Sequence, residues 1–153
     1  MIRYMLLLYF FSIAAIGKAQ DGYTHFFARG GLVYKNAGKA SIGFDLARKY
    51  HNAYELALTY YRPHTGRENY LLGINYKPVI VRNKNSTFRF RFGGYAGTDM
   101  DKFIAAPNMG FEFHQAIAPK LDLIFANNNG FMFWGEKHNA WRIDLEVGLK
   151  FSL

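Results

Sequence analysis

The sequence predicts an all-β protein, an eight-stranded antiparallel up-and-down transmembrane β-barrel. Turn-forming residues cut the chain into eight segments of similar length, and apolar residues alternate with polar or small ones within most segments. The closing stretch, residues 141–153, alternates without a break to its last residue. A strand of an ordinary soluble protein has only about five or six residues. Long alternating strands are typical of membrane barrels instead.

The first nineteen residues have the pattern of a secretory signal peptide. Arg3 provides a positive start, an apolar run follows, and Gly17 and Ala19 are small residues placed before a cleavage point. We expect cleavage before Gln20, which leaves residues 20–153 as a single barrel domain. The alternative is an uncleaved membrane anchor, for which the apolar run is short.

Seven turn signals separate the eight predicted strands. They fall at 35–39, 51–52, 63–67, 83–86, 97–107, 118–120 and 135–139. With both chain ends on the periplasmic side, the turns at 51–52, 83–86 and 118–120 face the periplasm, and the other four face outward. Short periplasmic turns and longer outer loops are expected of such barrels.

Each predicted strand has one apolar face and one polar or small face. The first segment, 24–35, is the least regular because Gly30 and Gly31 interrupt it. The alternation of the seventh stops at Asn127–Asn129 and resumes at Phe131. In chain order, the apolar faces of the others are Ile42, Phe44 and Leu46; Tyr54, Leu56, Leu58 and Tyr60; Tyr70, Leu72, Ile74 and Tyr76; Phe88, Phe90 and Phe92; Met109, Phe111 and Phe113; and the odd-numbered residues from Trp141 to Leu153.

The other face carries nearly equal numbers of acids and bases. A soluble sandwich would place a solvated, uniformly polar face there. Balanced charges instead suit a closed interior, where an unpaired charge is costly. Tyr and Trp at the strand ends fit the aromatic girdles of a lipid-facing exterior. We therefore predict an interior ion network formed by Asp45, Glu55, Arg89, Arg91, Glu112, Arg142, Asp144 and Glu146.

The composition and motifs argue against several kinds of chemistry. An eight-stranded barrel is just wide enough to be filled by side chains, so no solute channel is expected. Outer-membrane deacylases carry a His-x-Ser pair on one strand, but His114 is followed by Gln115 and Ala116, and no serine after residue 19 lies near a histidine in sequence. No histidines or acids have a recognisable metal-ligand spacing, the chain has no cysteine, and no basic cluster indicates nucleic acid. We expect no enzyme activity, cofactor, metal or direct nucleic-acid contact.

Four stretches resemble the conjugal transfer protein TraO family of Bacteroidetes conjugative elements. They are "ELALTYYR" (55–62), "ENYLLGINY" (68–76), "FRFGGYAGTD" (90–99) and "MFWGEKHNAWRIDLEVGLKFSL" (132–153). The resemblance implies a non-enzymatic outer-membrane component of a conjugative DNA-transfer apparatus, with other conjugation proteins as partners. Two alternatives stay open: a general small barrel for adhesion or membrane stabilisation, and a lipid A-modifying enzyme.

Two further surfaces are candidates for recognition. The end of the chain resembles the signal read by the barrel assembly machinery, carried by Glu146, Gly148, Phe151 and Leu153. The expected partners are therefore outer-membrane lipid and that machinery, in the outer membrane of a Gram-negative bacterium. Exposed outer loops are the other candidate, because strand packing does not explain their residues. The candidate contact loop is Thr98, Asp99, Met100, Asp101, Lys102 and Phe103.

Overall fold

The computed structural model describes residues 23–34, 37–64, 66–134 and 140–153. The predicted signal peptide, residues 1–19, lies outside them. No helix within the described ranges is long and apolar enough to cross a membrane.

The described chain is built almost entirely from strands. Their bounds are β1 (Thr24–Val33), β2 (Ala37–Ala47), β3 (Ala53–Pro63), β4 (Asn69–Lys77), β5 (Val79–Arg82), β6 (Ser86–Thr98), β7 (Phe103–Ala118), β8 (Leu121–Phe131) and β9 (Trp141–Ser152), with a 3₁₀ turn, η2 (Lys49–His51), between β2 and β3.

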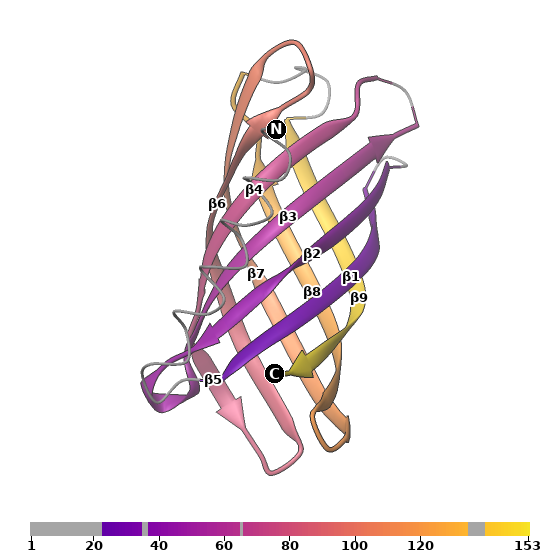
Figure 1. Ribbon diagram of the computed structural model, residues 1–153. Coiled ribbons are helices and arrows are strands. Elements are labelled where there is room, and N and C mark those ends of the chain that lie inside the picture. The colour runs from indigo at the N-terminus through magenta and orange to yellow at the C-terminus, as the bar shows by residue number, and fades with distance from the viewer. Residues whose placement is uncertain (1–22, 35–36, 65, 135–139) are drawn as a thin grey trace, which may run out of the picture.

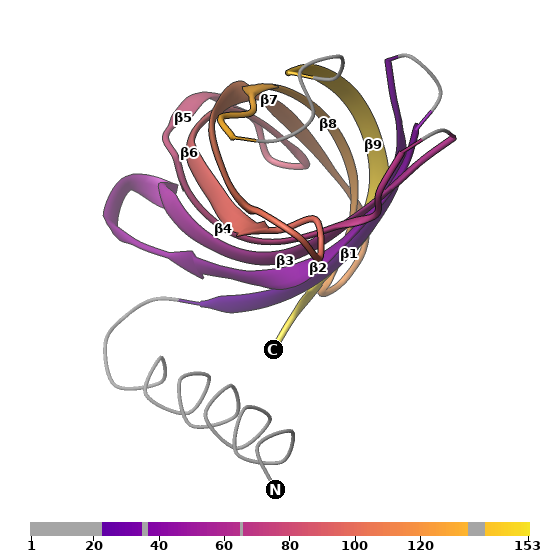
Figure 2. The ribbon, with the colours of Figure 1, turned by 90° about the horizontal axis from the view of Figure 1, so that it is seen from above.

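All neighbouring strands pair antiparallel and the sheet closes on itself. The order is β4-β3-β2-β1-β9-β8-β7-β6-β5, and an additional β4–β6 pairing completes the ring (Figures 1 and 2). Only Pro78 separates β4 from β5, and both pair with β6. Proline has no N–H for the ladder, so β5 is the continuation of β4 past a local break. With β4 and β5 counted as one stave, that is, one strand position around the ring, the sheet is a closed eight-stranded barrel, which confirms the predicted fold class.

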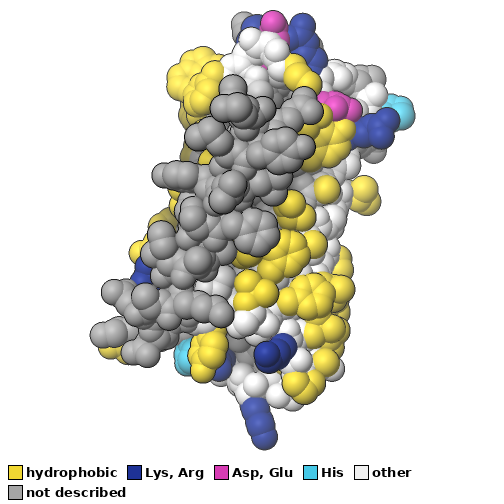
Figure 3. Space-filling model, viewed as in Figure 1, with side chains coloured by type: hydrophobic (Ala, Val, Ile, Leu, Met, Phe, Trp, Pro, Cys, Tyr) yellow, Lys and Arg dark blue, Asp and Glu magenta, His cyan; other side chains and the backbone are white. Residues whose placement is uncertain are grey.

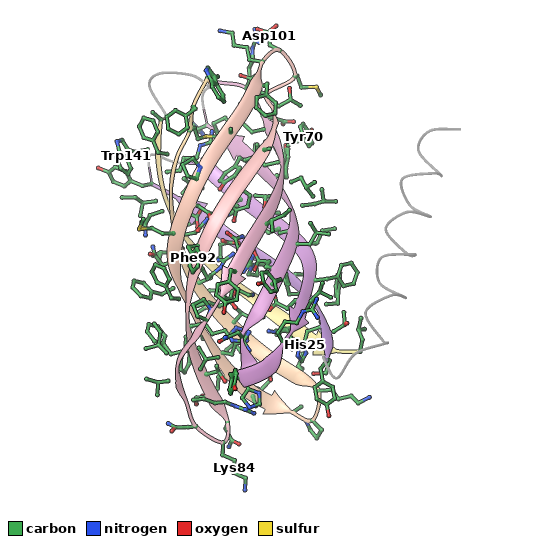
Figure 4. The ribbon with its side chains drawn as sticks, turned by 90° about the vertical axis from the view of Figure 1, so that its left-hand side faces the viewer. His25, Tyr70, Lys84, Phe92, Asp101 and Trp141 are labelled. Carbon is green, nitrogen blue, oxygen red and sulfur yellow. The ribbon has the colours of Figure 1, made fainter. Side chains whose placement is uncertain are left out.

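The two ends of the barrel are defined by their turns. The lower end in Figure 1 holds the start of β1, the end of β9 and the connections at 48–52, 83–85 and 119–120. The upper end holds the turn at 99–102, the ends of β1, β3 and β8, and the starts of β2, β4 and β9. Figure 4 shows Lys84 at the lower tip and Asp101 at the upper tip. The turn signal predicted at 135–139 lies outside the described residues.

The predicted long loop at 97–107 is wrong. β6 runs to Thr98 and β7 begins at Phe103, so only residues 99–102 form the turn. Alternation continues beyond the turn, with Ile104 and Ala106 buried inside the barrel. The start of β7 could not be predicted from alternation because both faces of the segment are apolar or small. Pro107 also indicated a loop.

The exterior wall is apolar and the interior is largely charged. Hydrophobic side chains cover the wall that is visible in Figure 3, and the charged ones gather mostly near the two ends. The tilted rings of Tyr60 and Tyr70 lie 5.2 Å apart at the upper border, and those of Tyr54 and Tyr76 lie 5.0 Å apart at the lower border. These pairs match the predicted aromatic levels.

The predicted loss of phase at Asn127–Asn129 is also wrong. β8 keeps one alternation throughout: Ile124, Ala126 and Asn128 are buried inside, whereas Asn127 and Asn129 occupy outward positions. At Asn127 and Asn129 the outward side chains become polar, but the backbone keeps its alternation between inward and outward positions. Assigning every outward position to an apolar residue therefore predicted a loss of alternation that the strand does not have.

An apolar cluster, which we call the upper plug, closes the upper part of the interior. It was not anticipated, because the sequence pattern assigned apolar residues to the exterior. Its buried members are Val33, Tyr61, Leu71, Tyr95, Ile104, Ala106 and Met132.

Candidate functional site

Two glutamates at the centre of the interior share three cations. Arg29 on β1 donates to both, to Glu55 Oε1 at 3.0 Å and to Glu112 Oε2 at 2.8 Å. Lys77 Nζ lies 3.1 Å from Glu55 Oε2 and 2.8 Å from Glu112 Oε1. Arg91 Nη2 donates to Glu55 Oε1 at 2.6 Å. The five residues come from β1, β3, β4, β6 and β7, so this centre joins opposite walls of the barrel.

A second group lies nearer the upper plug. Lys39 Nζ is 2.8 Å from Asp144 Oδ2 and 2.7 Å from Glu146 Oε1. The Tyr61 hydroxyl donates to Asp144 at 3.3 Å, which connects the plug to the charges. Arg29 Nε lies 3.4 Å from Glu146 Oε2 and links this group to the central one.

A third group occupies the lower part of the interior. Asp45 accepts from Lys77 and from Lys150, each at 2.6 Å. His114 hydrogen-bonds to Glu112, which ties this group to the centre. Lys150 Nζ lies 3.5 Å from His114 Nδ1. The three groups form one connected network along the barrel axis.

Burial makes this network a structural element. Side chains of its acids and bases are almost completely shielded from solvent. Such charges are tolerated only when they are paired and hydrogen-bonded, and removing one partner of a buried pair costs roughly 3–5 kcal/mol. The network therefore holds the staves together and fills the lumen.

The structure brings most of the predicted network residues together. Asp45, Glu55, Arg91, Glu112, Asp144 and Glu146 belong to it, and Arg89 lies at its edge, 3.9 Å from Asp45. Arg142 lies beside the second group: its guanidinium carbon is 4.4 Å from the centre of the Tyr61 ring, and Tyr61 donates to Asp144.

Four basic members were missing from the predicted set. Alternation places Lys77 and Lys150 on the charged faces of regular strands, although they are not among the residues of the predicted network. Arg29 belongs to the irregular first segment, where Phe27 is also buried and packs 4.2 Å from the Arg29 guanidinium. Lys39 falls in a stretch interpreted as a turn, although β2 begins at Ala37.

Asp45, Glu112 and His114 are close enough to be considered as metal ligands. Their ligand atoms all lie within 4.8 Å of one another, and all three residues are buried. However, the ammonium groups of Lys77 and Lys150 already contact Asp45, and Lys77 also contacts Glu112. A metal ion would have to displace two positive charges, so the donor set favours ion pairs.

A serine and a histidine that are far apart in sequence meet at the lower end. Ser152 Oγ lies 2.9 Å from His25 Nδ1, because β9 and β1 place these residues opposite each other at the closing seam. Asp45 is the β2 neighbour of His25 in the ladder. Its carboxylate contacts Lys77 and Lys150, so the acid that would orient the histidine for nucleophilic catalysis is already engaged.

The candidate contact loop is largely explained by its own turn. The Thr98 hydroxyl accepts from the Met100 N–H at 3.0 Å, and Asp99 Oδ1 accepts from the N–H groups of Asp101 and Lys102 at 3.1 and 2.7 Å. Asp101 pairs with Arg67 across the upper end at 2.6 Å. Turn hydrogen bonds and this ion pair therefore account for Thr98, Asp99 and Asp101 without strand packing. Met100 and Phe103 remain exposed.

The Asp99 turn should depend on pH. Backbone N–H donation, chiefly from Lys102, holds the pKa of Asp99 below its usual value. A carboxyl with a lowered folded pKa contributes stability above its unfolded pKa of about 4 and loses it as the pH falls through the folded value. We expect amide-exchange protection of Lys102 to persist at neutral pH and to fall in acid. In Asp99→Asn, this protection should not change across the same acid range.

The residues proposed as an assembly signal have different positions. Glu146 is buried and paired with Lys39, whereas Phe151 and Leu153 are on the outside. Gly148 points inward at the β9–β1 seam, where a Cβ would lie 2.6 Å from Arg29 Cγ. Leu153 N donates to Thr24 O at 3.0 Å.

Comparisons with known proteins show the fold. No family model matches the chain, and no curated protein matches it. A solved structure described as a de novo designed transmembrane β-barrel is similar with a TM-score of 0.62 at 12% identity, over 88% of this chain and 98% of that one. The N-terminal barrel domain of Pseudomonas aeruginosa OprF is similar with a TM-score of 0.55 at 15% identity, over 86% and 100%. Ail, the attachment invasion locus protein of Yersinia pestis, is similar with a TM-score of 0.53 at 9% identity, over 86% and 97%.

Proposed function

We propose that this chain is a non-enzymatic barrel of the outer membrane, of the general kind that serves adhesion or membrane stabilisation. The filled interior is the observation that carries the proposal. The ion network and the upper plug occupy the lumen, and the cavity between them, bordered by Tyr61, Tyr95 and Asn128, is only about 10 Å³. That is room for about one water molecule. A barrel with a filled lumen acts through its outer surfaces.

The exterior supports lipid as a partner. A shallow apolar groove of about 490 Å³ crosses the outward faces of β2, β3, β4 and β6, beside Ile42, Leu58 and Leu72. Tyr60 and Tyr70 border it, and Figure 4 shows Tyr70 below the upper turn. Its chemistry and depth suit an acyl chain. The aromatic rings at the border suit the interface between acyl chains and head groups.

The filled lumen predicts the electrical behaviour of the protein. We expect the purified chain, inserted in a planar bilayer, to give no stable conductance steps, because the buried ion pairs and the upper plug fill the lumen of the described chain. A porin inserted under the same conditions serves as the positive control. Reproducible steps from this chain would contradict a function confined to its surfaces.

The cellular role requires a separate experiment. Deleting the gene should leave the lipid A mass spectrum unchanged and should alter either attachment to surfaces or resistance to detergents and bile salts. A changed lipid A spectrum would instead support an enzyme, with Ser152 and His25 as the first residues to test.

Conjugative transfer is the second candidate, favoured by the resemblance of residues 55–62, 68–76, 90–99 and 132–153 to the TraO family. In this case the upper end and its connections would contact other conjugation proteins. Deleting the gene from a transfer-proficient element should lower the number of transconjugants, and complementation should restore it. An unchanged transfer frequency would leave only the general barrel.

A further inference from the structure

Two asparagines interrupt the apolar exterior between its centre and its upper aromatic border. Asn127 and Asn129 occupy outward positions of β8, between Phe125 below and Phe131 above. A residue advances about 3.3 Å along a strand, or about 2.5 Å along the axis of a tilted barrel. In an apolar band about 25 Å tall, Asn127 therefore lies about 10 Å and Asn129 about 5 Å below the ring pair of Phe131 and Trp141, so both lie within the band.

The surroundings of the two carboxamides are apolar. Asn129 is paired in the sheet with Met109 on β7 and Ile143 on β9, both exposed on the wall. Asn127 is paired with Phe111 and Leu145, which are also exposed. On the rest of the described wall, the central outward positions hold apolar side chains or glycine.

The hydrogen bonds of these asparagines are incomplete. Asn127 Nδ2 donates to the Asp144 carbonyl at 3.1 Å, and Asn129 Nδ2 donates to Asn127 Oδ1 at 2.8 Å. Within the described part of the chain, no hydrogen bond reaches Asn129 Oδ1. At this depth there is no bulk water, and acyl chains offer neither donors nor acceptors. A polar group facing the membrane interior therefore calls for a polar partner at the same depth.

A second copy of this chain meets that requirement directly. A carboxamide carries both a donor and an acceptor, so two carboxamides can pair with each other. Two copies inserted in the same orientation, related by a two-fold axis normal to the membrane, place their Asn129 side chains at equal depth. Such an interface is self-complementary, as in most homodimers.

We propose that the outward faces of β7, β8 and β9 around Asn127 and Asn129 form a contact between two copies of this chain within the membrane. The inference rests on the proposed membrane function. The Asn129 carboxamides of the two copies hydrogen-bond across the axis, and the flanking Met109 and Ile143 side chains pack around them.

The absence of cysteine from the whole sequence permits a direct test. In membranes carrying Met109→Cys, at a position that is 59% exposed beside Asn129, mild oxidation should produce a disulfide dimer on non-reducing gels. The matched control is Leu58→Cys, on the opposite stave β3, whose outward side chain is 44% exposed. We expect roughly tenfold more dimer for the first variant, because the axis holds the two thiols at high effective concentration. Equal yields, or a product containing a different protein, would overturn the inference.

A second cysteine variant tests whether the two asparagines themselves are needed for the contact. Ile143→Cys, 46% exposed beside Asn129, should cross-link in the otherwise unchanged chain and lose most of this product when Asn127→Leu and Asn129→Leu are added. The triple variant should keep its folded gel mobility, since leucine suits the lipid face. Undiminished cross-linking contradicts the carboxamide contact. Recovery of the unsubstituted chain in the soluble fraction contradicts the membrane function itself, whereas a monomer in the membrane fraction contradicts only the dimer.

Discussion

Glu55→Gln should destabilise the barrel by roughly 3–5 kcal/mol, because it leaves three buried cations with only one of the two glutamates that they share. Glu55 contacts Arg29, Lys77 and Arg91, and it also accepts from Asn75 Nδ2 at 2.9 Å. The amide keeps the shape of the side chain and removes only its charge. Urea unfolding in lipid vesicles, followed by tryptophan fluorescence and by the gel mobility of unheated samples, measures the loss.

Two further variants test whether the loss of stability comes from unpaired buried charge. Asp101→Asn removes a carboxylate of an exposed pair, 54% exposed on each side, and should cost at most about 1 kcal/mol. Glu55→Gln combined with Arg91→Gln removes both members of the shortest pair at the centre and should recover part of the stability, since fewer unpaired charges remain. Equal unfolding midpoints for Glu55→Gln and Asp101→Asn would show that the interior network does not stabilise the barrel.

Gly148→Val should prevent the barrel from closing. The new side chain would overlap the carbonyl oxygen of Ala28 and stand 2.7 Å from Arg29 Cα at the β9–β1 seam. It would also push on Arg29, which holds Glu55 and Glu112. Backbone atoms cannot move aside as flexible side chains do, and overpacking even a core side chain costs about 1–3 kcal/mol. We expect unheated samples to lack the folded band.

The same variant separates packing from recognition. If Gly148 matters because of steric closure, Gly148→Val fails to refold from urea into detergent, where no assembly machinery is present. If it matters only as part of an assembly signal, the variant refolds in detergent and fails only in cells. Val147→Ala, on the lipid side of the same seam, is the matched control and should refold normally in both settings.

Much of the fold was predictable because a barrel wall repeats one simple rule. Each stave faces lipid on one side and the lumen on the other, so a period of two residues determines the faces of β2, β3, β4, β6 and β9. The rule failed where polarity and direction diverged. Asn127 and Asn129 are polar yet outward, and Ile104 and Ala106 are apolar yet inward.

The sites were less predictable than the faces, because pairing depends on neighbours around the ring. Alternation placed Glu55 and Glu112 inside, but it could not show that Arg29 on β1 reaches both. Ser152 and His25 are far apart in sequence and meet only because the first and last staves close the barrel. The turn at 99–102 was mistaken for a long loop because strands with two apolar faces carry no alternation signal.

Alternation along the regular strands was sufficient to predict a closed transmembrane barrel and the inward-facing residues of those strands, because the two faces follow directly from strand geometry. Only the tertiary structure showed which charges pair, that the upper plug closes one end, and that the carboxamides of Asn127 and Asn129 lie within the lipid-facing band. These features depend on strand register and on barrel closure, which bring residues of different strands together. The apolar pattern of a single strand does not specify them.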